Sequence, residues 1–85
     1  MESGDLRNRI SESIKLLEGY RGFSPIVDEA ISHLQFIDDC VAEPTPRKME
    51  EARLRLKTLT DNIAPYRSYV PELAATLDEL TKWFS

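Results

Sequence analysis

Tyrosine and arginine occur side by side twice in the chain, each time shortly before a proline. Residues 20–25 read Tyr-Arg-Gly-Phe-Ser-Pro, and residues 66–71, which lie 46 positions later, read Tyr-Arg-Ser-Tyr-Val-Pro. Guanidinium groups bind carboxylates and phosphates, often with two hydrogen bonds. Tyrosine and arginine are also enriched among the residues that dominate protein-interface energetics. The repeated Tyr-Arg phrase therefore predicts a binding surface, for an anion or for a protein, made by Tyr20, Arg21, Tyr66 and Arg67.

The same residues also have a purely structural interpretation. Each phrase ends in a proline that can start a helix, so each copy is typical of a corner between two helices. In that interpretation the two tyrosines close one end of a helical bundle, and the two arginines bind the last carbonyl groups of the preceding helices. Both interpretations place the Tyr-Arg phrases at helix corners, and the residues alone leave the choice between them open.

Other reactive side chains are few. His33 is the only histidine, and a metal-binding helical bundle needs a Glu-x-x-His pattern on two helices. Cys40 is the only cysteine, and no nucleophile-base set or glycine-rich phosphate loop is present in the sequence. We expect His33 at the surface or an interface, and Cys40 as a small buried or interfacial thiol. The sequence thus predicts no metal, no cofactor and no enzymatic activity.

Composition limits the classes of partner. The 85 residues fit one helical domain, residues 1–85, with 41% hydrophobic and 31% charged residues, as in globular proteins. The net charge of −4 and the pI near 4.9 disfavour nucleic acid as a partner. No apolar run is long enough to cross a membrane, and no basic, apolar leader starts the chain. With a single cysteine, these features predict a cytoplasmic protein without a membrane partner.

Four segments have the apolar spacing of helices. Apolar residues recur every three or four positions over residues 3–19, 25–42, 46–63 and 70–84. Ser24-Pro25 and Thr45-Pro46 each combine a capping hydroxyl with a proline in the first helical position. Gly19 is expected to end the first helix in a left-handed conformation. Since no stretch alternates with a period of two, the sequence predicts an all-α fold.

The two halves of the chain resemble each other beyond the Tyr-Arg phrase. At the offset of 46, the identical pairs are Arg7/Arg53, Arg9/Arg55, Tyr20/Tyr66, Arg21/Arg67, Pro25/Pro71 and Leu34/Leu80. This pattern predicts an internal repeat of two helical hairpins, residues 3–42 and 46–84. Helices joined by short loops pack antiparallel, so we expect an up-down-up-down four-helix bundle. Both Tyr-Arg phrases should then lie at the same end.

A second candidate surface comes from apolar residues that lie away from the main helical stripes. These residues are Leu16, Phe36, Leu54 and Trp83. The segment 25–42 is the most apolar, and we expect it to be the most buried and also to present a partner face centred on Phe36, Ile37 and Cys40. The sequence therefore favours a non-enzymatic protein-interaction or adaptor module that forms a homodimer or binds another protein. The alternative is a ligand- or anion-responsive regulatory domain that uses the paired Tyr-Arg corners.

Overall fold

The computed structural model, which describes residues 3–85, confirms the all-α prediction. Its elements are α1 (Ser3–Glu18), α2 (Pro25–Ala42), α3 (Pro46–Ile63), a short 3-10 helix η1 (Ala64–Tyr66) and α4 (Pro71–Phe84). The bounds of the four α-helices lie within one residue of those predicted. The η1 turn was not predicted, and residues 3–85 contain no strand.

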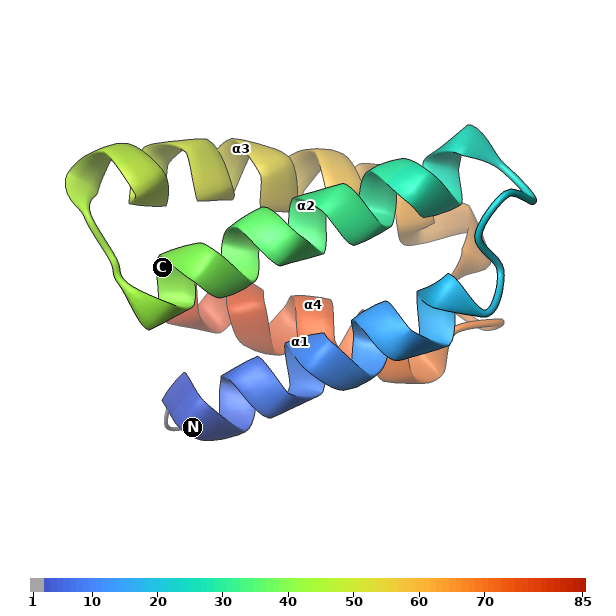
Figure 1. Cartoon of the computed structure of the whole chain (residues 1–85), viewed down its shortest axis with the longest axis horizontal. Coiled ribbons are helices and arrows are strands. Elements are labelled where there is room, and N and C mark those ends of the chain that lie inside the picture. Colours follow the sequence, from blue (N-terminus) through green and yellow to red (C-terminus); the bar gives the residue numbers. More distant parts are fainter. Residues whose placement is uncertain (1–2) are drawn as a thin grey trace.

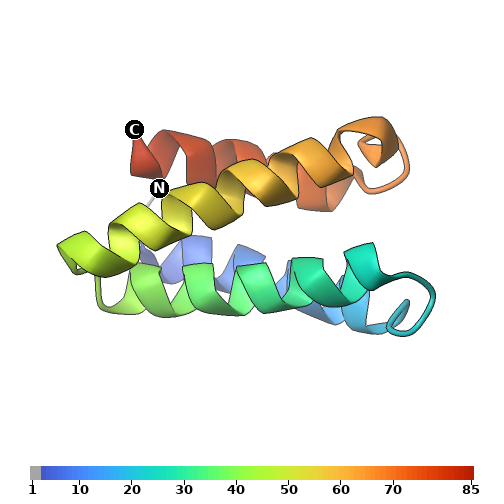
Figure 2. The same ribbon diagram turned by 90° about the horizontal axis from the view of Figure 1, so that it is seen from above.

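The four helices form an up-down-up-down bundle (Figure 1). Contacts join α1 to α2, α2 to α3 and α3 to α4, and contacts between α1 and α4 close the ring. The two hairpins are stacked as layers when the bundle is seen from above (Figure 2). The α1–α2 and α3–α4 connections lie at one end, and the α2–α3 connection lies at the other. The predicted topology, with both Tyr-Arg phrases at one end, is therefore confirmed.

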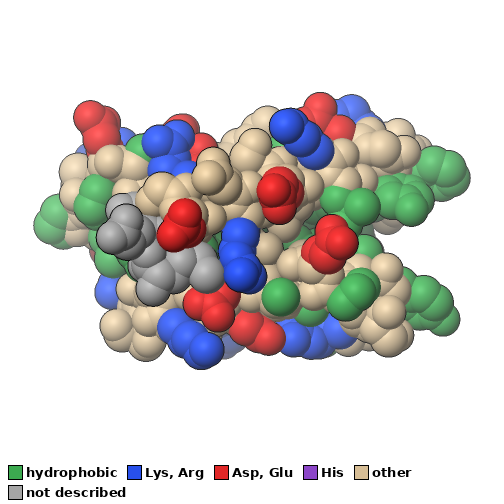
Figure 3. Space-filling model, turned by 90° about the horizontal axis from the view of Figure 1, so that it is seen from below, with side chains coloured by type: hydrophobic (Ala, Val, Ile, Leu, Met, Phe, Trp, Pro, Cys, Tyr) green, Lys and Arg blue, Asp and Glu red, His purple; other side chains and the backbone are tan. Residues whose placement is uncertain are grey.

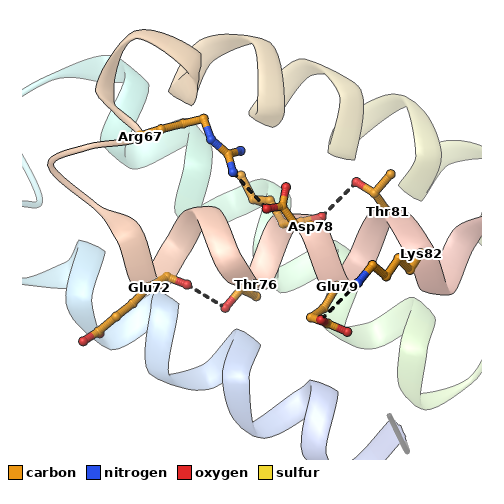
Figure 4. Close-up of polar contacts among 8 residues, drawn as sticks. Arg67, Glu72, Thr76, Asp78, Glu79, Thr81 and Lys82 are labelled. Carbon is orange, nitrogen blue, oxygen red and sulfur yellow. Dashed lines mark hydrogen bonds and ion pairs between the residues drawn. The ribbon is translucent and has the colours of Figure 1, made fainter.

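Leucine and isoleucine from all four helices fill the centre of the bundle. Fully buried examples are Leu6, Ile10, Leu34, Leu59, Leu73 and Leu80. Two polar side chains are buried with them, and they hydrogen-bond to each other: the Ser13 hydroxyl donates to Thr76 Oγ1 over 3.1 Å. The Thr76 hydroxyl in turn donates to the Glu72 carbonyl oxygen over 3.1 Å (Figure 4). This chain of hydrogen bonds satisfies the only buried polar pair between α1 and α4 among the described residues.

Helix starts follow the predicted caps. The Ser24 hydroxyl accepts a hydrogen bond from the Ile26 amide over 3.2 Å, and the Thr45 hydroxyl accepts one from the Lys48 amide over 3.2 Å. The prediction for Gly19 is wrong, because the glycine with a positive φ is Gly22, at 90°. The chain leaves α1 through successive turns, and only the later of them requires the left-handed region.

One pair of equivalent positions joins the two helices in each hairpin, through different kinds of contact. In the first hairpin, the Arg7 guanidinium on α1 binds the Asp38 carboxylate on α2 through two contacts of 3.0 and 3.2 Å. In the second, Arg53 Nε on α3 donates to the Phe84 carbonyl oxygen on α4 over 3.2 Å. Arg53 and Phe84 lie 46 positions after Arg7 and Asp38, which is the offset of the predicted internal repeat. The repeat itself stays a prediction.

Candidate functional site

The two helix corners enclose a groove at one end of the bundle. Corner 1 is residues 19–24, between α1 and α2, and corner 2 is residues 64–70, between α3 and α4. The groove between them, called the corner groove below, has a volume of about 580 Å³. Seen from below, hydrophobic side chains protrude from two lobes at this end, with a notch between them (Figure 3). The bundle ring thus leaves an open, apolar hollow where the Tyr-Arg phrases meet.

The walls of the corner groove are built from equivalent residues of the two hairpins. Four lining pairs are related by the offset of 46, namely Leu17/Ile63, Tyr20/Tyr66, Phe23/Tyr69 and Ser24/Val70. The remaining lining residues, Ile26, Val27 and Ala30, all come from α2. The position of α4 equivalent to Ile26 is occupied by Glu72. The groove is therefore nearly symmetric in its aromatic walls, but its apolar floor extends over α2 only.

The aromatic rings of this groove are unusually exposed. Phe23 and Tyr69, which occupy the same position of the two phrases, are 81% and 82% exposed. Five of the six exposed large hydrophobic side chains of residues 4–85 line the groove, and the sixth is Leu54 on α3. Tyr20 and Phe23 contact edge to face, with ring centroids 6.1 Å apart. A contiguous exposed apolar patch of this kind marks an interaction site, whereas scattered exposed residues do not.

The two arginines of the Tyr-Arg phrases differ in their partners. Arg67 Nη2 lies 2.9 Å from Asp78 Oδ2 on α4 (Figure 4). The residue of α2 equivalent to Asp78 is Ser32, which has no charge to offer. Arg21 accordingly is exposed and makes no ion pair with any residue of the described chain. Among the described residues, corner 1 thus presents an unpaired guanidinium, whereas the guanidinium of corner 2 is paired with a carboxylate.

The corner geometry does not favour a small anion held between the two arginines. Arg67 already lies beside a carboxylate, which would compete with an anion for this half of a symmetric site. The amide of Gly22 is also occupied, since it donates to Asp28 Oδ1 over 3.3 Å. The positive end of α2 therefore already has both a hydroxyl cap, from Ser24, and a carboxylate beside it.

The prediction of a partner face centred on α2 needs correction. Ile37 and Cys40 are 0% exposed and belong to the core, so neither is available to a partner. Phe36 is half-buried, and the Arg55 guanidinium lies 4.5 Å from its ring centroid. The reason is that α2 contacts both α1 and α3, so two neighbours cover its broad apolar face.

The other predicted interface residues do not gather into one surface. Leu16 is half-buried on α1, and Leu54 is 61% exposed on α3, which is not a neighbour of α1 in the ring of helices. Trp83 is half-buried near the end of α4 and packs its ring at 4.9 Å from that of Phe84. The structure thus brings together Tyr20 and Tyr66 at the corner groove, but it leaves Leu16, Leu54 and Trp83 apart.

The remaining candidate groups lie far from reactive arrangements. His33 Nδ1 lies 3.4 Å from Arg55 Nη1, and Cys40 Sγ lies 3.7 Å from Met49 Sδ. Burial raises the pKa of the Cys40 thiol, which disfavours the nucleophilic thiolate. Residues 3–85 hold no group of three metal-ligating side chains, and none of the helices in this range is long and apolar enough to span a membrane.

Comparison with protein-family models, with curated proteins and with solved structures finds no match to this chain. Its function is therefore inferred from its own residues.

Phe23 and Tyr69 were not among the predicted site residues, although they are the most exposed rings of the groove. The signal for them was present in the sequence. Both occupy the aromatic position of the repeated phrase, three residues after Tyr20 and Tyr66. Because these two positions lie in the corners, they are not part of the apolar face of any helix. An aromatic residue there therefore has no place in the core.

Proposed function

We propose that this chain is a non-enzymatic protein-interaction module that binds a segment of another protein in the corner groove. The observation that carries the proposal is the gathering of five exposed large hydrophobic side chains around one groove. Exposing rings such as Phe23 and Tyr69 to water is unfavourable unless a partner covers them. Aromatic residues at the centre of an interface also supply most of its binding free energy.

The position of the rings argues for binding and against a role in folding. Phe23 and Tyr69 are more than four-fifths exposed, so their side chains contribute little to the free energy of unfolding. The core is filled by other residues, and the capping of α2 depends on Ser24. The rings are thus free to be used by a partner.

Self-association as a homodimer has weaker support than binding to a different protein. The face of α2 that the sequence favoured for a homodimer has Ile37 and Cys40 in the core. A dimer through the corner grooves would bring Arg21 of one copy, which is unpaired among the described residues, towards that of the other, and residues 19–24 contain no acidic residue to offset these charges. We therefore propose that the partner is a different protein and not a second copy of this chain.

The test is a selection from a display library of random peptides on the immobilised protein. We expect peptides to be enriched on the wild-type chain, and we expect Phe23→Ala with Tyr69→Ala to weaken their binding about thirtyfold or more, because truncating aromatic hot-spot residues costs about 2 kcal/mol or more. Leu54→Ala is the matched control, since it removes an exposed apolar side chain away from the groove. Equal binding by the double variant and the wild type would reject the proposal, as would a failure to enrich any peptide.

A further inference from the structure

We propose that the segment bound in the corner groove is acidic and amphipathic, with apolar anchors for the aromatic walls and a carboxylate for Arg21. This inference rests on the proposed function and specifies the chemistry of the partner. It follows from three features of the corners: their charge, their asymmetry and the spacing of their exposed rings.

The charged residues within the two corners are both arginines. Residues 19–24 and 64–70 contain Arg21 and Arg67 and no acidic residue, although the chain has a net charge of −4. The closest acidic residues to corner 1 in sequence are Glu18, at the end of α1, and Asp28, which accepts the Gly22 amide. Because Arg67 is paired with Asp78, Arg21 carries the one positive charge of the two corners that no ion pair among the described residues compensates. A carboxylate on a partner would complement that charge and orient its binding.

The asymmetry between the corners places the partner carboxylate. Arg67 binds Asp78, but the equivalent position on α2 is Ser32, which leaves Arg21 without an intramolecular partner. The same side of the groove carries the apolar floor from α2, with Ile26 where α4 has Glu72. Apolar anchors and an acidic residue of the partner are thus both favoured at corner 1. Although the groove is nearly symmetric, this difference between the corners favours one orientation of a bound peptide.

The exposed rings set the size of the occupant. Phe23 and Tyr69 belong to opposite corners, so a small molecule inside the groove would leave much of both rings in water. The bundle measures 33 × 22 × 19 Å, and the corner end shows its smaller cross-section. A helix of about 14 residues, with a rise of about 1.5 Å per residue, has a length close to that cross-section. Such a helix offers apolar residues at every third or fourth position to a groove of this kind.

The test is to select peptides on the immobilised wild-type chain and on the Arg21→Glu variant, and to compare the sequences of the two sets. We expect the wild-type peptides to combine large apolar residues at helical spacing with a net negative charge. We expect Arg21→Glu to weaken the best of them about fivefold at low salt, because an exposed charge contact is worth up to about 1 kcal/mol, and to select peptides of neutral or positive charge. Raising NaCl from about 0.1 M to about 1 M shortens the screening length from about 10 Å to about 3 Å. That change should remove most of the difference between Arg21→Glu and the wild type.

The outcomes separate this inference from the function on which it rests. Peptides that depend on Phe23 and Tyr69 but carry no acidic bias would overturn the acidic partner and leave the interaction module in place. Peptides that bind equally well to the Phe23→Ala, Tyr69→Ala variant would overturn both. Doubled mass of the free chain in light scattering, lost in that double variant, would identify a second copy as the occupant and would also overturn the acidic partner.

Discussion

The two corners of the bundle share a sequence motif but differ in backbone conformation and in how the following helix is capped. Corner 1 uses Gly22 with a φ of 90° and starts α2 with the Ser24 cap. Corner 2 begins with η1, has Ser68 at the position of Gly22, and starts α4 after Val70, which offers no capping side chain. What the corners keep in common is the pair of rings that line the groove. The backbone of the turn thus differs between the two corners, whereas aromatic residues occupy the same positions of both and line the same groove.

The largest difference in stability is expected at the glycine. Alanine at Gly22 would have to adopt a positive φ, although a Cβ there would meet no atom within 4 Å, so the cost is conformational. We expect Gly22→Ala to lower the free energy of unfolding by about 1.5 kcal/mol. Ser68→Ala is the matched control at corner 2, where no residue has a positive φ, and it should change stability by less than about 0.5 kcal/mol. Urea unfolding measures both, and equal losses would mean that the corners do not differ in backbone strain.

A smaller effect is expected at the cap of α2. Ser24→Ala removes the hydroxyl that accepts the Ile26 amide and should lower the free energy of unfolding by about 1 kcal/mol. Ser24→Asp retains a capping oxygen and should restore most of that loss. If alanine and aspartate destabilise the chain equally, the Ser24 hydroxyl does not function as a cap. The starts of α2 and α4 would then not differ in capping.

The smallest effect concerns the ion pair that corner 1 lacks. Ser32→Asp places a carboxylate at the position equivalent to Asp78, and we expect it to bind Arg21 and to weaken acidic peptides about two- to threefold. Gln35→Asp adds the same charge on an exposed part of α2 further from corner 1 and serves as the control. Titration at low salt measures both affinities. The same loss with either variant would show a general charge effect and no specific pairing with Arg21.

Much of the fold could be predicted because its signals are local. Ser24-Pro25 and Thr45-Pro46 mark helix starts, and the apolar spacing of four segments fixes which residues face the core. Short connections then leave one arrangement in which both Tyr-Arg phrases share an end. Tyr20 and Tyr66, predicted as site residues on this reasoning, do line one groove.

The errors have a common physical origin. In the predicted bundle the broad apolar face of α2 has two neighbours, but the apolar pattern does not tell which of its residues those neighbours cover. Because α1 and α3 both pack on α2, Ile37 and Cys40 are in the core and are not at a surface. The partner of Arg67 was likewise unpredictable, since Asp78 lies eleven positions away across a turn whose direction the sequence leaves undefined.

The most direct test of the central claim is to map where a selected peptide binds, by the change in backbone amide chemical shifts of the labelled protein. The largest changes should fall in residues 17–30 and 63–70, which include both corners and the first turns of α2. Residues around Leu54 and the α2–α3 connection should change little. Changes centred on those residues instead, with the corners unaffected, would contradict a binding function of the corner groove.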